Sequence, residues 1–358
     1  MALTTVRPEG LGFVNGRRNL IINGAMQVAQ RGTSSTGLGA AAGYFTVDRW
    51  SMGLNGTTAG RYTMSQSTDA PAGFSKSMKL DVTTADTSIA AGEAVGFLQR
   101  IEGQDIQRLS KGTSDAKTAV FSFYAKGTAK TFIVEFQDDN SRRFSRTFTT
   151  TTSWQRFEID VPADTTGEID DDNTAGLTII FWFHAGSDFT SGTLQTTWGG
   201  TTSANRMVGC ESLFSSTDNE LFITGVQLEV GSNASDFEHR SFGEELAACQ
   251  RYYQKSYIDG VAVGTVTQVG CNMDPVPTSG NTWRYTHNFT SHMRATPTYT
   301  FYVPDTGTSG FGGFEGAGDT NKEAIQVAFS SNKSGVYYST SMDQTGFFMW
   351  HYELNAEL

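Results

Sequence analysis

The sequence has few of the residues from which metal centres and disulfide frameworks are built. Its 358 residues include three cysteines, at wide and irregular spacings: Cys210, Cys249 and Cys271. An odd number without a repeated spacing predicts neither a disulfide framework nor a zinc site. Small buried apolar side chains are the simpler interpretation. The five histidines also lack the H-x-x-H and H-E-x-x-H spacings of metalloenzymes.

Catalytic sequence motifs are missing as well. No G-x-S-x-G segment is present to hold a nucleophilic serine. The glycine-rich segments contain no G-K-[ST], so no phosphate-binding loop is indicated. We therefore expect no catalytic residues and no cofactor, and we expect that the protein is not an enzyme.

Basic residues are fewer than acidic ones, 26 against 37, which gives a net charge of -11. A nucleic-acid surface needs a stripe of Lys and Arg, and anionic membranes attract basic segments, so neither partner is expected. No run of about 18 apolar residues occurs, so we expect no membrane insertion. Residues Met1 to Arg7 have no apolar core, and we expect no secretory signal.

Proline is scarce at 7 residues, whereas glycine is plentiful at 39 and aromatic residues reach 12%. Abundant Thr, Phe, Tyr and Gly, with few helical patterns, predict an all-β chain. Short alternating segments are separated by turn clusters at a spacing of roughly 8–12 residues, which is typical of a β-sandwich or jelly roll. The strongly apolar segment Leu177 to His184 is predicted to be a central strand.

Two apolar segments far apart in the sequence are predicted to be the first and last strands of this sandwich. Residues 18–32 open it and residues 222–231 close it, each bounded by glycine. Both show strand periodicity. We expect the two strands to lie close together, with Leu20, Ile22 and Val226 in the core.

A charged pair precedes a tryptophan in the next segment, where Asp48 and Arg49 stand before Trp50. One interpretation is a structural ion pair beside a core tryptophan. The other is a group that faces a ligand.

One short helix is predicted. Ser241 to Glu244 form a capping box, with Ser at the N-cap and Glu at N3. Phe242, Leu246 and Cys249 then recur at helical spacing and are interpreted as a packing stripe. The β pattern resumes after Tyr257. The predicted organisation is an N-terminal arm (1–17), a jelly-roll β-sandwich (18–235), a linker helix (236–256) and a small C-terminal β-sandwich domain (257–358).

Aromatic side chains on the predicted sheets are the main candidates for a binding site. An exposed ring can stack on the apolar face of a sugar while polar neighbours bind its hydroxyls. In the run 179–184, two phenylalanines alternate with Trp182 and His184, so one pair faces the core and the other faces outward. Burial in the core is the alternative for each tryptophan. The candidate glycan-binding residues of the strands are Trp182, His184, Trp198 and Trp283.

A glycine-rich segment in the C-terminal part is a second candidate. Residues 306–318 contain more glycine than any other segment, with Phe311 and Phe314 interleaved. Glycine with aromatic residues suits an adaptable binding surface, so both phenylalanines are candidate glycan contacts. A surface loop without a binding role is the alternative.

Carboxylates in residues 170–172 offer hard oxygen ligands. Asp170 and Asp172 are therefore a candidate Ca²⁺ site, although the alternation of an EF-hand loop is absent. Solvated turn residues are the simpler interpretation.

Several short segments occur in a fixed order that matches a known pattern. Residues 19–33 and 46–50 follow the pattern NLLINGxFxxxQRGT and TxDRW. Further matching segments are 197–199, 223–231, 237–242, 245–246 with 249–253, 293–297 and 356–358. Together they resemble tail-fibre-like proteins of tailed bacteriophages. The first segment and residues 223–231 also resemble jelly-roll carbohydrate-binding modules.

The resemblance implies a virion protein, assembled in the cytoplasm of the bacterial host and acting outside the cell. Such proteins are usually homotrimers, associate with other tail or virion proteins and often bind host cell-surface polysaccharide. The family has no agreed catalytic residues. This chain shows no long collagen-like or coiled-coil shaft, so a compact spike, adaptor or head fibre fits it better than an extended fibre.

Three functions follow from these observations. The preferred one is a tail-fibre or spike protein that binds host surface glycan without catalysis. The second is a purely architectural adaptor, head-fibre or decoration subunit. The third is a glycan depolymerase, with carboxylates contributed from different strands or chains.

Overall fold

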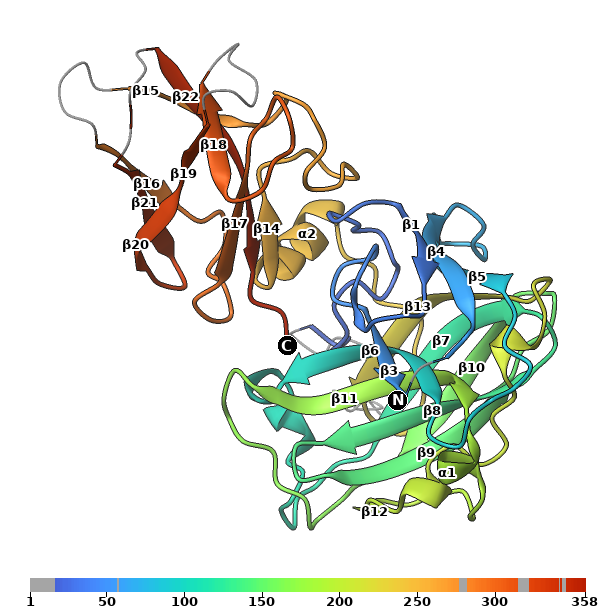
Figure 1. Ribbon diagram of the computed structural model, residues 1–358. Coiled ribbons are helices and arrows are strands. Elements are labelled where there is room, and N and C mark those ends of the chain that lie inside the picture. Colours follow the sequence, from blue (N-terminus) through green and yellow to red (C-terminus); the bar gives the residue numbers. More distant parts are fainter. Residues whose placement is uncertain (1–16, 57, 277–281, 315–321, 341, 343–345) are drawn as a thin grey trace, which may run out of the picture.

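The computed structural model describes residues 17–56, 58–276, 282–314, 322–340, 342 and 346–358. Its elements are almost entirely β-strands, which confirms the predicted all-β class (Figure 1). Two bodies are visible, one from the first two thirds of the chain and one from the last third.

The first body is a sandwich of two antiparallel sheets. The first sheet has six strands in the order β1-β4-β5-β13-β7-β10. These strands are β1 (Ser34–Leu38), β4 (Arg61–Ser67), β5 (Ser77–Thr84), β13 (Glu220–Val230), β7 (Ala119–Gly127) and β10 (Gln155–Val161).

The second sheet has seven strands in the order β12-β9-β8-β11-β6-β3-β2. These strands are β12 (Gly199–Gly200), β9 (Arg142–Thr149), β8 (Thr131–Asp138), β11 (Ala175–Ala185), β6 (Ala94–Glu102), β3 (Ser51–Asn55) and β2 (Gly43–Tyr44). Short helices in its connections are α1 (Ser187–Thr190), η2 (Gly103–Asp105), η3 (Gln107–Leu109), η4 (Ser203–Asn205) and η5 (Leu213–Ser215).

Alternation along the strands places one face of each sheet in a shared core. In β8, Phe132, Val134 and Phe136 belong to that core. The intervening residues, including Glu135 and Gln137, therefore lie on the outer face. Trp50 is fully buried and stacks on Phe97, with ring centroids 4.7 Å apart. The predicted jelly-roll sandwich is built around this aromatic core.

The opening segment is not a strand, contrary to the prediction. Residues 19–28 form turns and irregular backbone beside β13. Two backbone hydrogen bonds join them, from Leu20 N to Leu228 O and from Val226 N to Gly24 O, so the predicted proximity is correct. Asn23, at a φ of 57°, binds the backbone of Val28 through its side chain, which replaces a strand ladder by a local turn.

The predicted core positions of this segment are only partly correct. Leu20 and Val226 are buried, whereas Ile22 is half-buried and Ile21 is completely buried. Gly24 is required here because a Cβ atom would lie 2.1 Å from Val226 O. The close approach of turn and strand follows from that absence of a side chain.

The predicted helix is present as α2 (Phe242–Gln250), and its capping box is confirmed. The Ser241 hydroxyl accepts from Glu244 N, and the Glu244 carboxylate accepts from Ser241 N. The predicted stripe is partly wrong, because Phe242 is 48% exposed while Glu245 and Cys249 are buried. Glu245 Oε1 accepts from Asn23 N at 2.5 Å, so an acidic side chain rather than an apolar one fixes the helix on the opening turn.

The second body contains two further antiparallel sheets. One is centred on β22 (Phe347–Asn355) and β18 (Phe311–Phe314), with β14 (Tyr253–Lys255), β15 (Asn272–Pro275), β17 (Thr298–Tyr302) and β19 (Lys322–Ala324). The other has the order β16-β21-β20, with β16 (Trp283–Asn288), β21 (Ser334–Ser339) and β20 (Gln326–Ser330). Trp283, Tyr337 and Trp350 lie in their shared core.

The two bodies have separate cores, one formed by residues 20–228 and one by residues 276–356. The exact division at 17, 235 and 256 stays a prediction. The arm, apart from residue 17, lies outside the described residues.

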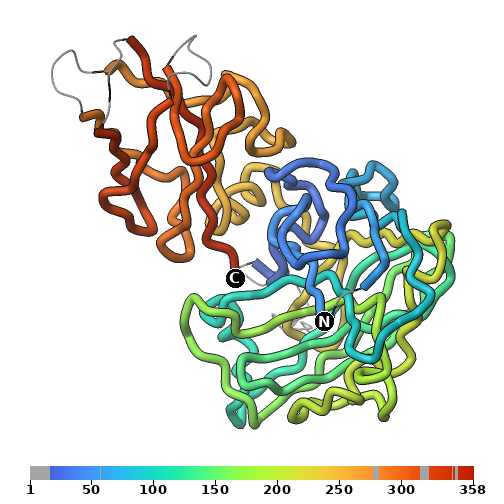
Figure 2. The backbone as a smooth tube through the Cα atoms, viewed as in Figure 1, coloured from blue at the N-terminus to red at the C-terminus, as the bar shows by residue number. Residues whose placement is uncertain are grey.

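A buried network of charges joins the two bodies at the C-terminal segment, which runs from the second body to the first (Figure 2). The Glu357 carboxylate binds Arg49 and lies 3.3 Å from Arg31 Nη2. Arg31 Nη1 is also 3.7 Å from Asp48 Oδ1. Asp48 and Arg49 are therefore both in structural ion pairs beside Trp50, but not with each other as predicted: Asp48 pairs with Arg31 and Arg49 with Glu357.

Replacing Glu357 by Gln should destabilise the protein strongly. The guanidinium of Arg49 is 1% exposed and would lose its charged partner. Breaking a buried pair on one side costs about 3–5 kcal/mol of unfolding free energy. Urea titration followed by tryptophan fluorescence measures this change.

The control for this experiment is Asp81→Asn, which breaks the exposed pair with Lys79. It should change the unfolding free energy by less than about 1 kcal/mol. Equal effects of the two substitutions would contradict the structural role of Glu357.

Candidate functional site

The outer face of the seven-stranded sheet carries a row of polar side chains. Thr178 on β11 is paired with Arg100 on β6 and with Gln137 on β8. Paired residues of neighbouring strands point to the same face, so the three side chains lie side by side. We call Arg100, Thr178 and Gln137 the polar row.

An apolar floor lies next to the polar row. Two positions along β11, Ile180 is paired with Leu98 on β6. The polar row and this floor line a groove of ≈ 380 Å³, together with Asp138, Asp139, Trp182 and Arg206. The side chains of Gln137 and Thr178 are half-buried and line the groove. Two partly exposed polar side chains, with no protein hydrogen-bond partner among the described residues, therefore face an open groove with an apolar floor.

Glu135 fixes the wall of this groove. Its carboxylate is completely buried and binds Arg206 through two contacts of 2.9 Å and Arg143 at 3.0 Å. Trp182 Nε1 donates to the same carboxylate at 2.6 Å. Both carboxylate oxygens of Glu135 accept hydrogen bonds in these contacts. Glu135 therefore holds the side chains of Arg143, Trp182 and Arg206 in place.

Trp182 lies on the outer face, while Phe181 and Phe183 lie in the core; the sequence had left open which of these two faces is buried. It is only 6% exposed and packs with Phe189 of the β11–β12 connection and Met207 of the β12–β13 connection. The ring also lies close to Gly96, where a Cβ atom would come within 2.7 Å of it. Only a small part of the expected stacking surface is therefore exposed, where Trp182 lines the groove.

His184 does not share a face with Trp182, contrary to the prediction. A bulge in β11 pairs Trp182 with Gly96 but His184 with Val95, a core residue. The extra residue, Phe183, reverses the alternation. His184 is completely buried, with Nδ1 2.8 Å from Ser212 Oγ and Nε2 3.2 Å from Glu93 Oε2. Burial lowers the pKa of His184, although Glu93 and Asp86 act in the opposite direction.

Trp198 is half-buried, packs against the first core and does not line the groove. It packs edge-on against Phe144, and Lys111 Nζ lies 4.4 Å from its ring centroid. The same ammonium binds Asp138 and Asp164. Lys111 therefore occupies one face of the ring that was predicted to contact glycan.

The candidates of the second body lie apart from this groove. Trp283 and Phe314 are buried in the second core, with exposures of 1% and 4%. Residues 311–314 form strand β18 rather than a loop, and residues 315–321 lie outside the described part. Phe311 is half-buried and packs with Lys322 at 5.3 Å. Glycan binding by the six aromatic candidates stays a prediction, but Trp182, His184, Trp283 and Phe314 have almost no exposed ring surface.

The candidate Ca²⁺ residues form a turn. Asp172 Oδ1 accepts from Thr174 N at 2.8 Å and from Thr174 Oγ1 at 2.7 Å. Asp170 donates its N–H to Asp139. Within the described residues, a different group brings three ligand atoms within 4.8 Å of one another: Asp86, Glu93 and His184.

The sequence did not identify the polar row. Alternation alone would assign Thr178, Gln137 and Arg100 to the outer faces of their strands. It would not place them side by side, because that requires the strand order and register. Their nearness became visible only with the pairing of β6, β11 and β8.

Comparisons with known proteins give similarities in structure alone. No known protein family matches the sequence, and no curated protein matches it. A structure titled "CBM4 structure and function" is 14% identical, covers 51% of this chain and 88% of its own, and has a TM-score of 0.29. TmCBM61 in complex with β-1,4-galactotriose is 11% identical, covers 60% and 100%, and has a TM-score of 0.32.

A third structure covers nearly the whole chain. The tandem CBM22-1–CBM22-2 domains of Paenibacillus barcinonensis Xyn10C are 8% identical, cover 97% of this chain and 93% of their own, and have a TM-score of 0.28. These solved structures are carbohydrate-binding modules by title. Such distant likenesses do not identify a ligand for this chain. In the described part of the structure, neither helix is long and apolar enough to cross a membrane.

The carboxylate of Asp164, which shares Lys111 with the groove residue Asp138, should make the free energy of unfolding depend on pH in the acid range. Burial acts to raise its pKa, but hydrogen bonds from Arg142 and Lys111 outweigh burial and hold the pKa at about 2. A depressed pKa stabilises the fold above the unfolded-state value of about 4, and this contribution is lost as the pH falls towards 2. Asp164→Asn should lower the unfolding free energy at pH 7 by about 2 kcal/mol and flatten its decline between pH 4 and 2.

Denaturant titrations at a series of pH values measure this effect. The exposed Asp115 provides the control, since Asp115→Asn should keep the wild-type profile. An unchanged decline in Asp164→Asn would show that other groups cause the acid sensitivity.

Proposed function

We propose that this chain binds glycan, without catalysis, in the groove beside the polar row. The observation that carries the proposal is the pair of partly exposed polar side chains, Gln137 and Thr178, next to an apolar floor. Sugars present hydroxyls and apolar C–H faces together, and sites for them combine convergent polar groups with apolar surface. Leu98 and Ile180 supply the apolar surface, and the polar row supplies the hydrogen bonds.

The carboxylates of the groove support binding rather than hydrolysis. A glycosidase needs two carboxyl groups on opposite sides of the reacting bond, one of them able to give a proton. Asp138 and Asp139 are the carboxylates of the lining, and they are adjacent in sequence. Asp138 is occupied by Lys111 and by Arg142 N.

We further propose that the protein acts on the virion of a tailed phage, as part of a fibre, spike or related appendage. The support is the ordered set of segments from residue 19 to residue 358 that resembles tail-fibre-like proteins. Such an assembly would be a homotrimer attached to other virion proteins. Three weak glycan sites on one particle would act together through avidity.

The substitution pair Gln137→Ala/Thr178→Ala should weaken glycan binding. Each hydrogen bond contributes about 0.5–1.5 kcal/mol, so the loss of both should reduce affinity roughly tenfold or more. An array of bacterial surface polysaccharides identifies a ligand, and calorimetry with that ligand measures the dissociation constants.

The matched control is Thr63→Ala/Gln155→Ala, at exposed or half-buried positions of the other sheet. It should bind as the wild type does. No binding to any polysaccharide would favour the architectural alternative, and release of fragments would establish a depolymerase.

The purified protein should be a homotrimer. Size-exclusion chromatography with light scattering should give three times the chain mass of 38.8 kDa. A dilution series tests whether the assembly persists at low concentration. A monomer at every concentration would count heavily against a tail-fibre-like assembly.

A further inference from the structure

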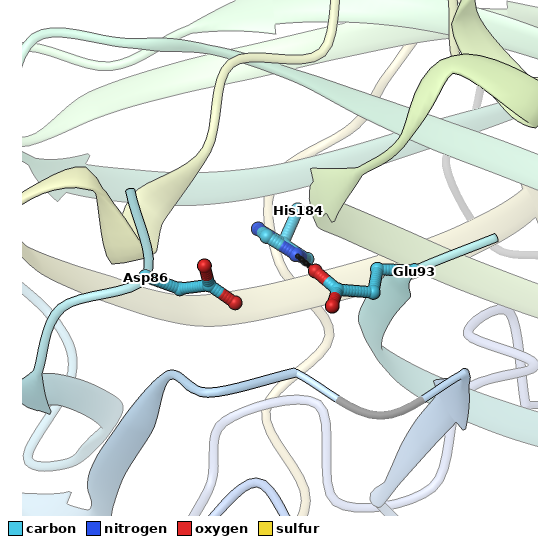
Figure 3. Close-up of side chains that lie close together, drawn as sticks. All are labelled: Asp86, Glu93 and His184. Atoms are coloured by element: carbon cyan, nitrogen blue, oxygen red, sulfur yellow. Dashed lines mark hydrogen bonds and ion pairs between the residues drawn. The ribbon is translucent and has the colours of Figure 1, made fainter. Parts of the chain in front are cut away.

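Three ligand-type side chains, none of which lines the groove, lie close together in the first body (Figure 3). Asp86 follows β5, Glu93 precedes β6, and His184 stands near the end of β11. Their ligand atoms lie within 4.8 Å of one another although the residues come from different segments. The β11 bulge is what turns the imidazole towards the two carboxylates.

The charge of this cluster is not balanced by a basic side chain. Asp86, Glu93 and His184 are 3%, 5% and 0% exposed. Within the described residues, neither carboxylate forms an ion pair with Arg or Lys. Burying two carboxylates beside one imidazole carries a large desolvation free energy unless a cation compensates their charge.

The distances and outer contacts suit a small divalent ion. Two ligands of a tetrahedral Zn²⁺, each about 2.0–2.1 Å from the ion, lie roughly 3.3 Å apart. Glu93 Oε2 and His184 Nε2 are 3.2 Å apart. The other ring nitrogen is held by Ser212 Oγ at 2.8 Å, as expected for a ligating histidine.

The third ligand is also held in place. Asp86 Oδ2 accepts from Thr58 Oγ1 at 2.7 Å and from Ala59 N at 2.9 Å, and Oδ1 accepts from Ser88 N at 3.1 Å. These contacts fix the carboxylate beside the other two groups. One imidazole nitrogen and two carboxylate oxygens form a ligand set that suits Zn²⁺ better than Ca²⁺, which prefers six to eight oxygens.

We propose that Asp86, Glu93 and His184 bind one Zn²⁺ ion, which joins the β5–β6 connection to β11. Water completes the coordination. The neutral imidazole would bind the ion through Nε2, and its single N–H then lies on Nδ1 and donates to Ser212 Oγ. This site is independent of the groove, and its test needs no glycan.

The full chain, stripped with EDTA and dialysed, is titrated with ZnCl₂ by calorimetry. We expect one ion per chain and a melting temperature several degrees higher in Zn²⁺ than in EDTA. Glu93→Gln and His184→Gln should each raise the dissociation constant at least tenfold and remove the shift in melting temperature. His287→Gln, at a buried histidine that contacts Tyr337 in the second body, should leave Zn²⁺ binding unchanged.

Zinc-edge X-ray absorption of the wild type keeps the test decisive if His184→Gln does not fold. Nitrogen and oxygen neighbours at about 2.0–2.2 Å support the proposal, whereas a sulfur shell at about 2.3 Å assigns the ion to cysteine and overturns it. Failure to bind one Zn²⁺ per chain, binding that Glu93→Gln does not weaken, or binding of CaCl₂ in preference to ZnCl₂ would also overturn it.

Discussion

The buried pairing of Glu357 with Arg31 and Arg49 is the constraint on which the arrangement of the two bodies depends. Each guanidinium also lies over a tyrosine of the segment that leaves α2: Arg31 is 3.7 Å from the ring centroid of Tyr253, and Arg49 is 3.4 Å from that of Tyr252. The network therefore joins the loops before β3, the strand β14 and the C-terminal residues. One step further, Arg100 binds Leu358 O, so the C-terminal segment also fixes a member of the polar row.

Burial of so many charges is tolerable because they balance. Two arginines face Asp48 and Glu357, and Gln30 donates further hydrogen bonds to Asp48. Burial nevertheless raises the pKa of Asp48 to about 6, although Arg31 and Gln30 act to lower it. Well-packed apolar residues could give as much stability as such a network. What the network adds is specificity of arrangement, because its charged groups can pair in only one relative orientation of the two bodies.

What the sequence could predict follows from the range of the interactions. The Ser241–Glu244 capping box involves neighbours three residues apart and was predicted correctly. Alternation along one strand placed Trp182 opposite Phe181, but it did not decide which of the two faces is buried. His184 lies on the face opposite to Trp182 because Phe183 is an extra residue in a bulge. The sequence contains no signal for that bulge. The turn at Asn23 was not predicted, because the apolar pattern favours a strand there. The Asn23 side chain instead binds the backbone of Val28. The ion-pair partners of Asp48 and Arg49 were not predicted either, because only the folded chain brings Arg31 and Glu357 to them.

The small exposed surface of Trp182 limits what a ligand can contact on the outer face of the sheet. The groove includes Trp182, but most of the surface that lines it comes from the polar row and its apolar floor. Strands are spaced about 4.8 Å apart, and the row across β6, β11 and β8 therefore spans roughly 10 Å. For the proposed glycan, that length suits a short saccharide segment held by hydrogen bonds, with mainly aliphatic contact from Leu98 and Ile180 beneath it. Weak single sites of this kind are useful mainly in a multivalent particle, which is why the proposed binding and the proposed trimer depend on each other.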